Sequence, residues 1–360
     1  MTESYEGFEN GGKREPVNSR HLSKKKSRRP LLIVIISVVA VLAIAGVAVG
    51  AYAYNLASSF NNNTQKIESA FPDESLRPAA AEGKDGKPAP VNILLMGSDA
   101  RSASVDASKD GQASDQRSDT LMLLHIPADR KNIYVMSVMR DTWIDIPGKG
   151  EAKINAALAN GGVPLVVQTL EGLFGVRIDH VAGMDFAGFE ALTDALGGVE
   201  IDVPYEFKSF HMPGKTFAKG KQLMDGATAL AYVRERYAFP DGDYQRVKNQ
   251  QAFLKAVMSK MLTAGTLSNP VTINDIVTKF SPFVSVDKSL DAGAVAALGV
   301  QLKDVRTSNV SMFTLPNLGT GTSADGQSIV VPDYNEIRKV SEALKSDSMA
   351  AYVQASKQGK

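Results

Sequence analysis

Apolar and polar positions change along the chain in blocks that predict intermixed strands and helices. Continuous apolar runs bounded by turn residues are typical of buried strands, whereas apolar residues three and four apart are typical of helices packed on a core. Strands are predicted at residues 91–97, 120–126, 132–139, 177–184, 199–204 and 310–316. Helices are predicted at residues 163–174, 186–196, 227–232, 244–261, 273–280 and 333–344. This mixture predicts an α/β or α+β fold in which helices cover a central mixed sheet.

One apolar block is much longer than the others. Residues 31–51 carry no charged side chain and, as a helix rising about 1.5 Å per residue, would span roughly 30 Å, the thickness of a hydrocarbon core. Lysines and arginines before this block favour a cytoplasmic N-terminus, and Tyr52 and Tyr54 follow it as interfacial aromatics. We therefore expect one transmembrane helix at residues 30–54, in the cell membrane. The alternative is a cleaved signal peptide, but its apolar part would be only about 7–15 residues long.

The charges divide the chain into two parts. The whole chain has 40 Lys+Arg and 39 Asp+Glu, which gives a formal net charge of +1. Residues 1–29 alone carry +4 and are predicted to be a basic cytoplasmic tail beside anionic lipid, whereas the remainder carries −3. A mildly acidic body argues against a nucleic-acid partner. The lack of cysteine excludes a disulfide scaffold.

Composition also predicts domain boundaries outside the membrane. Residues 55–90 are rich in Ala, Ser, Gly, Lys and Pro, so their apolar surface is too small to offset the entropy lost on ordering, and a linker or stalk is expected. Residues 91–345 contain the periodic blocks and are expected to form one extracytoplasmic catalytic domain. Residues 346–360 are expected to be a flexible tail.

Charged residues lie next to the ends of the first three predicted strands. If these strands lie antiparallel to their neighbours, five charged residues meet at one edge of the sheet: Asp99, Arg117, Asp119, Arg140 and Asp141. Carboxylate oxygens are ligands for Mg²⁺, and arginine binds phosphate oxygens through two parallel hydrogen bonds. The alternative, for each of these residues taken alone, is a solvated ion pair on the surface.

A second group of polar residues lies between positions 232 and 250. Arg234 and Arg236 would point to the same face of an extended segment. Arg246 and Gln250 are four residues apart on one face of a predicted helix, and Asp243 lies one turn earlier. Charges that recur at the ends of elements in a mainly apolar domain predict an anion-binding site.

Six motifs resemble those of one known family. In chain order they are NILLMGSDAR, RSDTLMLLHI, SVMRDTWIDIPG, KINAALANGG, AYVRERY and DYQRVKNQQ. Over about residues 91–260, their order and spacing resemble the LytR–CpsA–Psr family, whose short tail, single membrane helix and external domain are also expected here. The resemblance implies a phosphotransferase that moves a glycopolymer from an undecaprenyl-pyrophosphate carrier to peptidoglycan through a phosphodiester bond.

The resemblance also implies roles for individual residues. Asp99 and Asp119 match the positions that bind Mg²⁺, or Mn²⁺ in its place. The other matched positions form a pyrophosphate clamp with supporting partners: Arg117, Arg140, Lys153, Arg234, Arg236, Asp243, Arg246 and Gln250. Many relatives carry a further Arg where this chain has Asn249, so the resemblance implies a weaker clamp at that position. The partners that it implies are a polyprenyl-pyrophosphate-linked glycopolymer, peptidoglycan and the cytoplasmic membrane.

The chemistry expected of these residues is phosphoryl transfer, which depends on positioning and charge neutralisation. A sugar hydroxyl of peptidoglycan would attack the phosphorus next to the glycan, and polyprenyl phosphate would leave. The residues expected to take part in catalysis are Arg117, Arg140, Asp141 and Asp243. Either Asp141 or Asp243 could accept the hydroxyl proton, and the sequence does not choose between them. Two other functions stay open: hydrolysis of the same lipid-linked glycan, and a membrane-tethered regulator without enzymatic activity.

Apolar residues on two predicted helices, together with the last residue of the strand between them, could line a tunnel for the lipid or could simply form the core. They are Val163, Leu165, Val166, Leu170, Leu173, Phe174, Met184, Phe186, Phe189, Leu192 and Leu196. His125 lies inside an apolar strand and is expected to be structural. The sequence contains no zinc-binding, nucleotide-binding or serine-hydrolase motif.

Overall fold

The computed structural model of the chain describes residues 47–98, 118–263 and 269–358. Contacts divide the chain into two units, Met1–Tyr52 and Ala53–Lys360, and the second unit holds nearly all of the described residues. A helix covers residues 47–63. Within the described ranges, no helix has both the length and the apolar character needed to cross a bilayer. Most of the transmembrane helix predicted at 30–54 lies outside those ranges.

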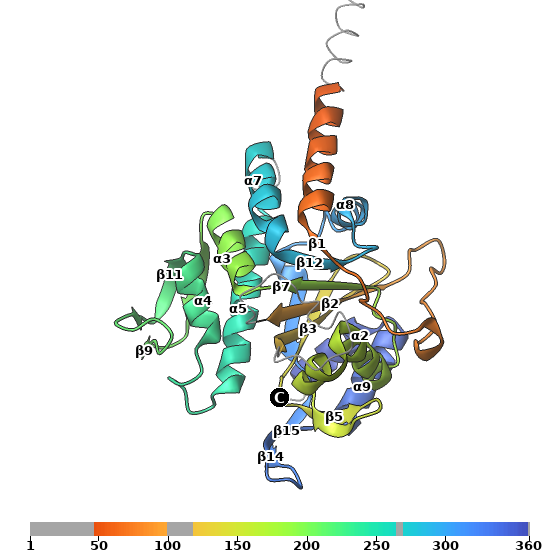
Figure 1. The fold of residues 1–360 in the computed structure, drawn as a ribbon, viewed down its shortest axis with the longest axis vertical. Helices are drawn as coiled ribbons and strands as arrows, with labels where there is room; N and C mark the ends of the chain where they lie inside the picture. The colour runs from red at the N-terminus through yellow and green to blue at the C-terminus, as the bar shows by residue number, and fades with distance from the viewer. Residues whose placement is uncertain (1–46, 99–117, 264–268, 359–360) are drawn as a thin grey trace, which may run out of the picture. The chain divides into compact units, whose positions relative to one another are not determined.

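A seven-stranded sheet forms the centre of the second unit (Figure 1). Its strands, in spatial order, are β1 (Gln65–Ile67), β12 (Val284–Asp287), β7 (His180–Met184), β2 (Val91–Ser98), β3 (Ser118–Ile126), β4 (Ile133–Val138) and β13 (Val310–Thr314). Three pairs are antiparallel (β2 with β3, β3 with β4 and β7 with β12) and the other three are parallel. The predicted mixed sheet is therefore confirmed, and the first three predicted strands have the antiparallel order on which the predicted charge cluster depends.

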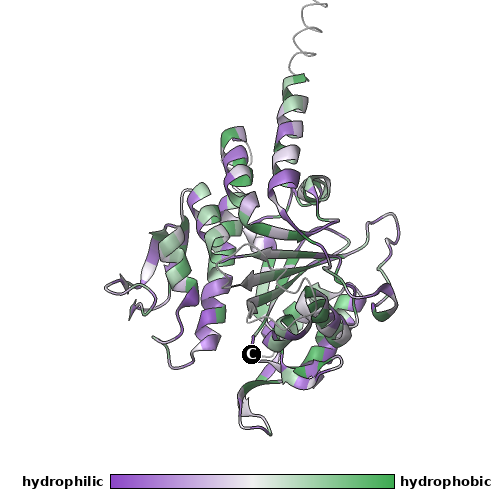
Figure 2. Cartoon of the chain, viewed as in Figure 1, coloured by the Kyte–Doolittle hydropathy of each residue, from purple (hydrophilic) through white to green (hydrophobic). Residues whose placement is uncertain are grey.

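Helices cover both faces of this sheet because the strands are apolar on both sides. Leu94 and Met96 of β2 point into one core, which also holds α2 (Asn155–Phe174) and α9 (Tyr334–Lys345). Leu95, one residue away, packs on the opposite face with side chains from α5 (Asp243–Met261). Figure 2 shows the central strands as continuously hydrophobic, whereas the helices around them mix hydrophobic and hydrophilic positions.

A second core lies beside the end of the sheet, under α3 (Phe186–Ala195), α4 (Gly226–Arg234) and α7 (Pro270–Phe280). Two small antiparallel ribbons close this core: β8 (Val199–Val203) with β11 (Gly220–Met224), and β9 (Phe207–Lys208) with β10 (Thr216–Phe217). Asp185 and Asp225 accept backbone N–H groups and so begin α3 and α4. These caps fix the residue at which each helix begins, directly after β7 for α3 and directly after β11 for α4.

Shorter elements complete the described unit. They are β5 (Trp143–Ile146), β6 (Gly150–Lys153), β14 (Asn317–Thr322), β15 (Ser328–Pro332), α8 (Ala292–Gln301), α10 (Met349–Gln358), η1 (Glu74–Leu76), η2 (Ser281–Phe283) and η3 (Thr307–Asn309). None of these was predicted. Strands of four to six residues and single helical turns contain too few positions to establish a period, and the ten-residue helices α8 and α10 have mostly exposed residues without a clear apolar face.

The structure shows ordered elements in parts of the segments that were expected to be a linker and a flexible tail. Residues 53–90 belong to the same compact unit as the predicted domain, and Ile67 of β1 is buried in the main core. Arg77 also reaches inward, where its guanidinium is 2.6 Å from the carboxylate of buried Glu171. In the tail, α10 packs Met349 into the same core. A few well-placed apolar and charged residues therefore order segments whose average composition predicts disorder.

Candidate functional site

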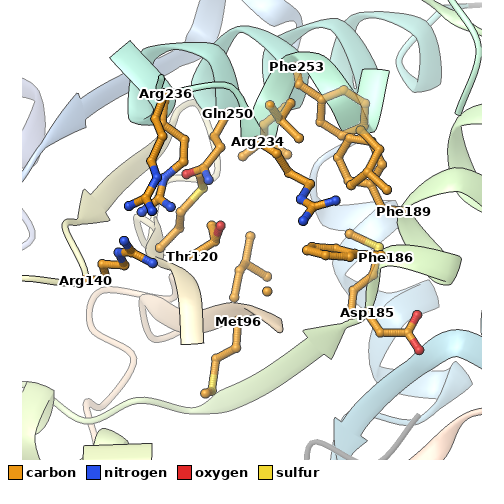
Figure 3. A pocket seen from close by; sticks show the side chains of 18 of the residues that line it. Met96, Thr120, Arg140, Asp185, Phe186, Phe189, Arg234, Arg236, Gln250 and Phe253 are labelled. Carbon is orange, nitrogen blue, oxygen red and sulfur yellow. The ribbon is translucent and has the colours of Figure 1, made fainter. Parts of the chain in front are cut away.

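A pocket of about 360 Å³ opens at the sheet edge where the charged residues were predicted to meet (Figure 3). Because β2, β3 and β4 alternate in direction, the end of β2, the start of β3 and the end of β4 lie together. Gly97 and Thr120 form a cross-strand pair there, and both line the pocket. Arg140 follows β4 and reaches the pocket from the same edge. The remaining walls come from the start of α3, the end of α4 and one face of α5.

The pocket has an apolar end and a cationic end. Figure 3 shows Phe186, Phe189 and Phe253 on one side, with the rings of Phe189 and Phe253 stacked at 4.1 Å between their centres. Arg140 and Arg236 lie on the opposite side of the view. Between the two ends, the guanidinium carbon of Arg234 lies 4.4 Å from the centre of the Phe186 ring. The pocket therefore suits a ligand with an anionic group joined to an apolar chain.

Asp243 organises the cationic end. Its Oδ2 accepts a hydrogen bond from Arg140 Nε at 3.2 Å and one from Arg246 Nη2 at 3.1 Å. Its Oδ1 lies 3.6 Å from Arg236 Nη1. Three guanidinium groups on one carboxylate leave an excess of positive charge beside the pocket. Such an excess, carried by arginines with fixed orientations, binds phosphate oxygens well.

Asp141 and Lys153 support this cluster from behind. Lys153 Nζ lies 3.4 Å from Asp141 Oδ1, and Asp141 Oδ2 lies 3.8 Å from Arg140 Nε. Asp141, Lys153 and Asp243 are not among the described residues that line the pocket. The predicted site residues that do line it are Arg140, Arg234, Arg236, Arg246 and Gln250. The structure thus brings five of the predicted clamp residues together in the pocket lining, and it places Lys153 and the two candidate bases outside that lining.

Three predicted site residues cannot be placed in the same way. Asp99 and Arg117 lie outside the described residues. Asp119 is in β3, directly before Thr120, which pairs with Gly97 at the pocket edge. The described residues contain no cluster of three or more His, Asp or Glu side chains that could hold a metal ion. The assignment of Asp99 and Asp119 as metal ligands therefore stays a prediction.

The extended segment predicted for Arg234 and Arg236 is wrong, although both residues do reach the pocket. Helix α4 continues through Arg234, and Arg236 lies in the turn that follows. Glu235, between them, was not recognised from the sequence. It is buried and accepts the backbone N–H groups of Arg236 and Tyr237 at 3.1 Å each. The only signal in the sequence is its position directly after the apolar face of a helix.

The lipid-tunnel hypothesis fits three of its residues. Met184, Phe186 and Phe189 line the pocket, but Val163, Leu165, Val166, Leu170, Leu173 and Phe174 belong to the main core around α2, and Leu192 and Leu196 to the second core. For those eight residues the simpler interpretation, packing, is correct. Sequence reasoning missed the apolar pocket residues contributed by α4 and α5, such as Leu230 and Phe253, because helical periodicity does not distinguish a pocket wall from a core.

The contacts of Asn249 and His125 show that both side chains have structural roles. Asn249, where relatives were expected to carry arginine, is buried, and its side chain donates to Tyr232 O at 3.1 Å and accepts from Gln245 at 2.9 Å. It links α5 to α4 behind the pocket. His125 is also buried, with Nδ1 2.8 Å from Asn92 Oδ1, so the structural role predicted for it is confirmed.

Comparisons with known proteins identify the family of the chain. The LytR_cpsA_psr family model matches residues 51–346. The polyisoprenyl-teichoic acid–peptidoglycan teichoic acid transferase TagU of Enterococcus faecalis is 29% identical over 320 residues, which is 88% of this chain and 97% of that protein. TagU of Bacillus cereus is 32% identical over 265 residues, covering 73% and 81% of the two chains. The crystal structure of Bacillus subtilis TagV aligns with a TM-score of 0.60 and 28% identity, over 72% of this chain and 97% of TagV. The chain therefore belongs to the LytR_cpsA_psr family.

Proposed function

We propose that this chain transfers a glycopolymer from a polyprenyl-pyrophosphate carrier to peptidoglycan and so forms a phosphodiester bond. The observation that carries the proposal is the polarity of the pocket, with Arg140, Arg236 and Arg246 around Asp243 at one end and stacked phenylalanines at the other. A pyrophosphate joined to a polyprenyl chain has the same polarity. Family membership supports the reaction class, and the names of the two TagU relatives state a transfer from polyisoprenyl-teichoic acid to peptidoglycan.

In the proposed reaction, an acceptor hydroxyl oxygen attacks the phosphorus next to the glycan. A new P–O bond forms, the bond to the bridging oxygen of the pyrophosphate breaks, and polyprenyl phosphate leaves with the electron pair. The arginines offset the negative charge that develops on the leaving group. Asp141 and Asp243 are both ion-paired with guanidinium groups and do not line the pocket, so their contacts favour an orienting role. The hydroxyl proton then passes to water.

A divalent cation is part of the proposal. The start of β3, which contains Asp119, pairs with the end of β2, which directly precedes Asp99 in the sequence. Two aspartates at such positions would be a donor set that Mg²⁺ or Mn²⁺ accepts while it keeps several waters. When bound, the cation would supply positive charge to the pyrophosphate oxygens. The residues of this chain would hold the lipid phosphate in the arginine cluster and the prenyl chain against Phe186.

The membrane arrangement completes the proposal. Residues 30–54 would anchor the chain with a cytoplasmic N-terminus, so that the pocket works outside the cytoplasm near the surface that carries the polyprenyl lipid. The partners are then the lipid-linked glycopolymer, peptidoglycan and the membrane itself. The apolar end of the pocket supports a lipid ligand, because three aromatic side chains line a space open to solvent.

The test is a transfer assay with the full-length chain in detergent, a lipid-linked glycan, Mg²⁺ and peptidoglycan fragments. We expect glycan to appear on peptidoglycan through a phosphodiester, detected by mass spectrometry, and we expect chelation of the metal to reduce the rate. Release of glycan phosphate at the same rate without peptidoglycan would instead establish the hydrolytic function. A chain with neither activity, although it binds the lipid, would contradict both.

A further inference from the structure

Three aromatic side chains meet beside the cationic end of the pocket, and two of them are strongly exposed. Phe210 is 67% exposed and Tyr237 is 57% exposed. The rings of Phe210 and Tyr237 lie 4.8 Å apart between centres, and His211 lies 6.0 Å from Tyr237. His211 and Tyr237 also line the pocket. We call Phe210, His211 and Tyr237 the aromatic platform.

A buried carboxylate holds the aromatic platform in place. Glu235 is 0% exposed, and one of its oxygens accepts the backbone N–H of Phe210 at 2.6 Å. Its other oxygen accepts the backbone N–H of Tyr237 at 3.1 Å. Burying a charge is unfavourable unless several donors satisfy it, and here the donors come from the two segments that carry the exposed rings. The backbone segments that carry the two rings are therefore held next to each other before any ligand binds.

The aromatic platform is joined directly to the arginine cluster. Arg236 Nη2 donates a hydrogen bond to the Tyr237 hydroxyl at 2.5 Å, and its guanidinium carbon lies 4.5 Å from the centre of the Tyr237 ring. Another nitrogen of Arg236 lies 3.6 Å from Asp243. A group bound on Tyr237 is thus next to an anion bound by Arg236. The apolar end of the pocket is occupied by other residues, Phe186 and Phe189, so the aromatic platform is not required for the prenyl chain.

We propose that the aromatic platform binds a pyranose ring, the sugar bonded directly to the pyrophosphate of the donor. This rests on the proposed function. The C–H groups on one face of a pyranose are apolar and carry partial positive charge, so they stack on the negative face of an aromatic ring while the hydroxyl groups stay in solvent. A sugar one bond from phosphorus can contact Tyr237 while its phosphate contacts Arg236. His211 adds a polar group to the edge of the aromatic platform. Burial and the nearby Arg234 lower the pKa of His211 below 6.5. At pH 7 its ring is therefore neutral and able to accept a hydrogen bond from a sugar hydroxyl.

The experiment compares two probes on the full-length chain in detergent: undecaprenyl pyrophosphate, and the same lipid carrying one N-acetylglucosamine on the pyrophosphate. For Phe210→Ala and for Tyr237→Ala, we expect the affinity for the sugar-bearing probe to fall about fivefold and the affinity for the sugar-free probe to change less than about twofold. Tyr237→Phe keeps the ring and should bind the sugar-bearing probe far better than Tyr237→Ala. The matched control is Leu223→Ala, an exposed apolar residue of the same region outside the pocket lining.

Three outcomes would overturn this assignment. Equal losses for both probes would mean that the rings only position Arg236, and no loss for either would mean that the rings bind nothing. A raised KM for peptidoglycan fragments with unchanged donor affinity would place the acceptor sugar there instead. Failure of the proposed function itself is seen separately in the transfer assay, because the wild-type chain would then move no glycan to peptidoglycan, whereas binding of the two probes is measured without an acceptor.

Discussion

Arg140 and Asp243 are 103 residues apart in the sequence, yet Arg140 Nε donates to Asp243 Oδ2 at 3.2 Å. Arg140 follows the last residues of β4, and Asp243 is the first residue of α5. The contact therefore joins the edge of the sheet to the helix that covers it. Because Arg246 shares the same oxygen, one carboxylate sets the positions of arginines from both elements.

Changing Asp243→Asn should lower the transfer rate more than the affinity for the donor. The substitution removes the charge that orients the arginines but leaves all of their positive charge available to the pyrophosphate. We expect kcat to fall about 100-fold, as for a mispositioned reacting group, while KM for the donor stays the same or decreases. Asp241→Asn is the control, since Asp241 is exposed and pairs with Lys248. A variant with wild-type kcat would show that Asp243 does not position the arginines.

Arg234→Ala should weaken binding of the lipid pyrophosphate. Among the described residues Arg234 makes no ion pair, and its guanidinium lies over Phe186 within the pocket lining, so its charge is available to a ligand. Loss of a charge-assisted hydrogen bond is worth about 1.5–3 kcal/mol, which predicts roughly a 10- to 100-fold lower affinity by direct binding measurement. Arg234→Lys should recover part of this loss, because lysine keeps the charge but not the planar contact. Equal affinity of Arg234→Ala and wild type would remove Arg234 from the clamp.

Arg77→Ala should strongly destabilise the fold. The Arg77 and Glu171 side chains are only 4% and 1% exposed, and the substitution would leave the Glu171 carboxylate buried without its partner. We expect the free energy of unfolding to fall by about 3–5 kcal/mol in chemical denaturation. The double variant Arg77→Met with Glu171→Leu should recover much of this, since an apolar pair leaves no buried charge. Lys221→Ala, at the exposed pair with Glu200, should change nothing measurable, and a similar loss there would contradict the argument.

Asp287 should make the fold sensitive to acid. Burial raises the pKa of Asp287, but hydrogen bonds from His180, Ser289 and the Val181 N–H outweigh this and lower the pKa from 3.8 to about 2. A carboxyl group whose pKa is lower in the folded state stabilises the fold above pH 3.8, and this stabilisation is lost as the pH falls towards 2. We expect about 2 kcal/mol of stability to disappear over that range, measured by chemical denaturation. Asp287→Asn should lose less stability than wild type between pH 4 and pH 2, and parallel curves would refute the assignment.

Much of the fold and of the arginine cluster could be predicted from the sequence. The strands around residues 91–139 are long and continuously apolar, so their existence followed from local pattern, whereas their antiparallel order was a condition that the structure meets. The arginines of the pocket stand at the ends of such elements, where the geometry of the sheet edge brings them together. Local pattern also placed Arg246 and Gln250 on one face of α5, and both line the pocket.

Other features could not be predicted, because they depend on contacts between distant segments. Glu235 looks like any charged residue between two arginines, and only the loop that carries Phe210 makes it a buried acceptor. Residues 64–77 have the composition of a linker, but they are ordered by β12 and by Glu171, which lie far away in the sequence. The average composition of a segment does not show that one of its residues has a specific partner elsewhere in the chain, as Arg77 has in Glu171.

By itself, the sequence determined the mixed α/β class, the sheet edge that carries the site and the family to which the motifs belong, because periodicity and motif spacing are local properties. The tertiary structure decided which apolar side chains face the pocket, that the two carboxylates stand behind the arginines, and that the aromatic platform lies next to Arg236. Burial and most ion pairs of the site are properties of the packed chain, and they appear only when segments that are separated in the sequence come into contact.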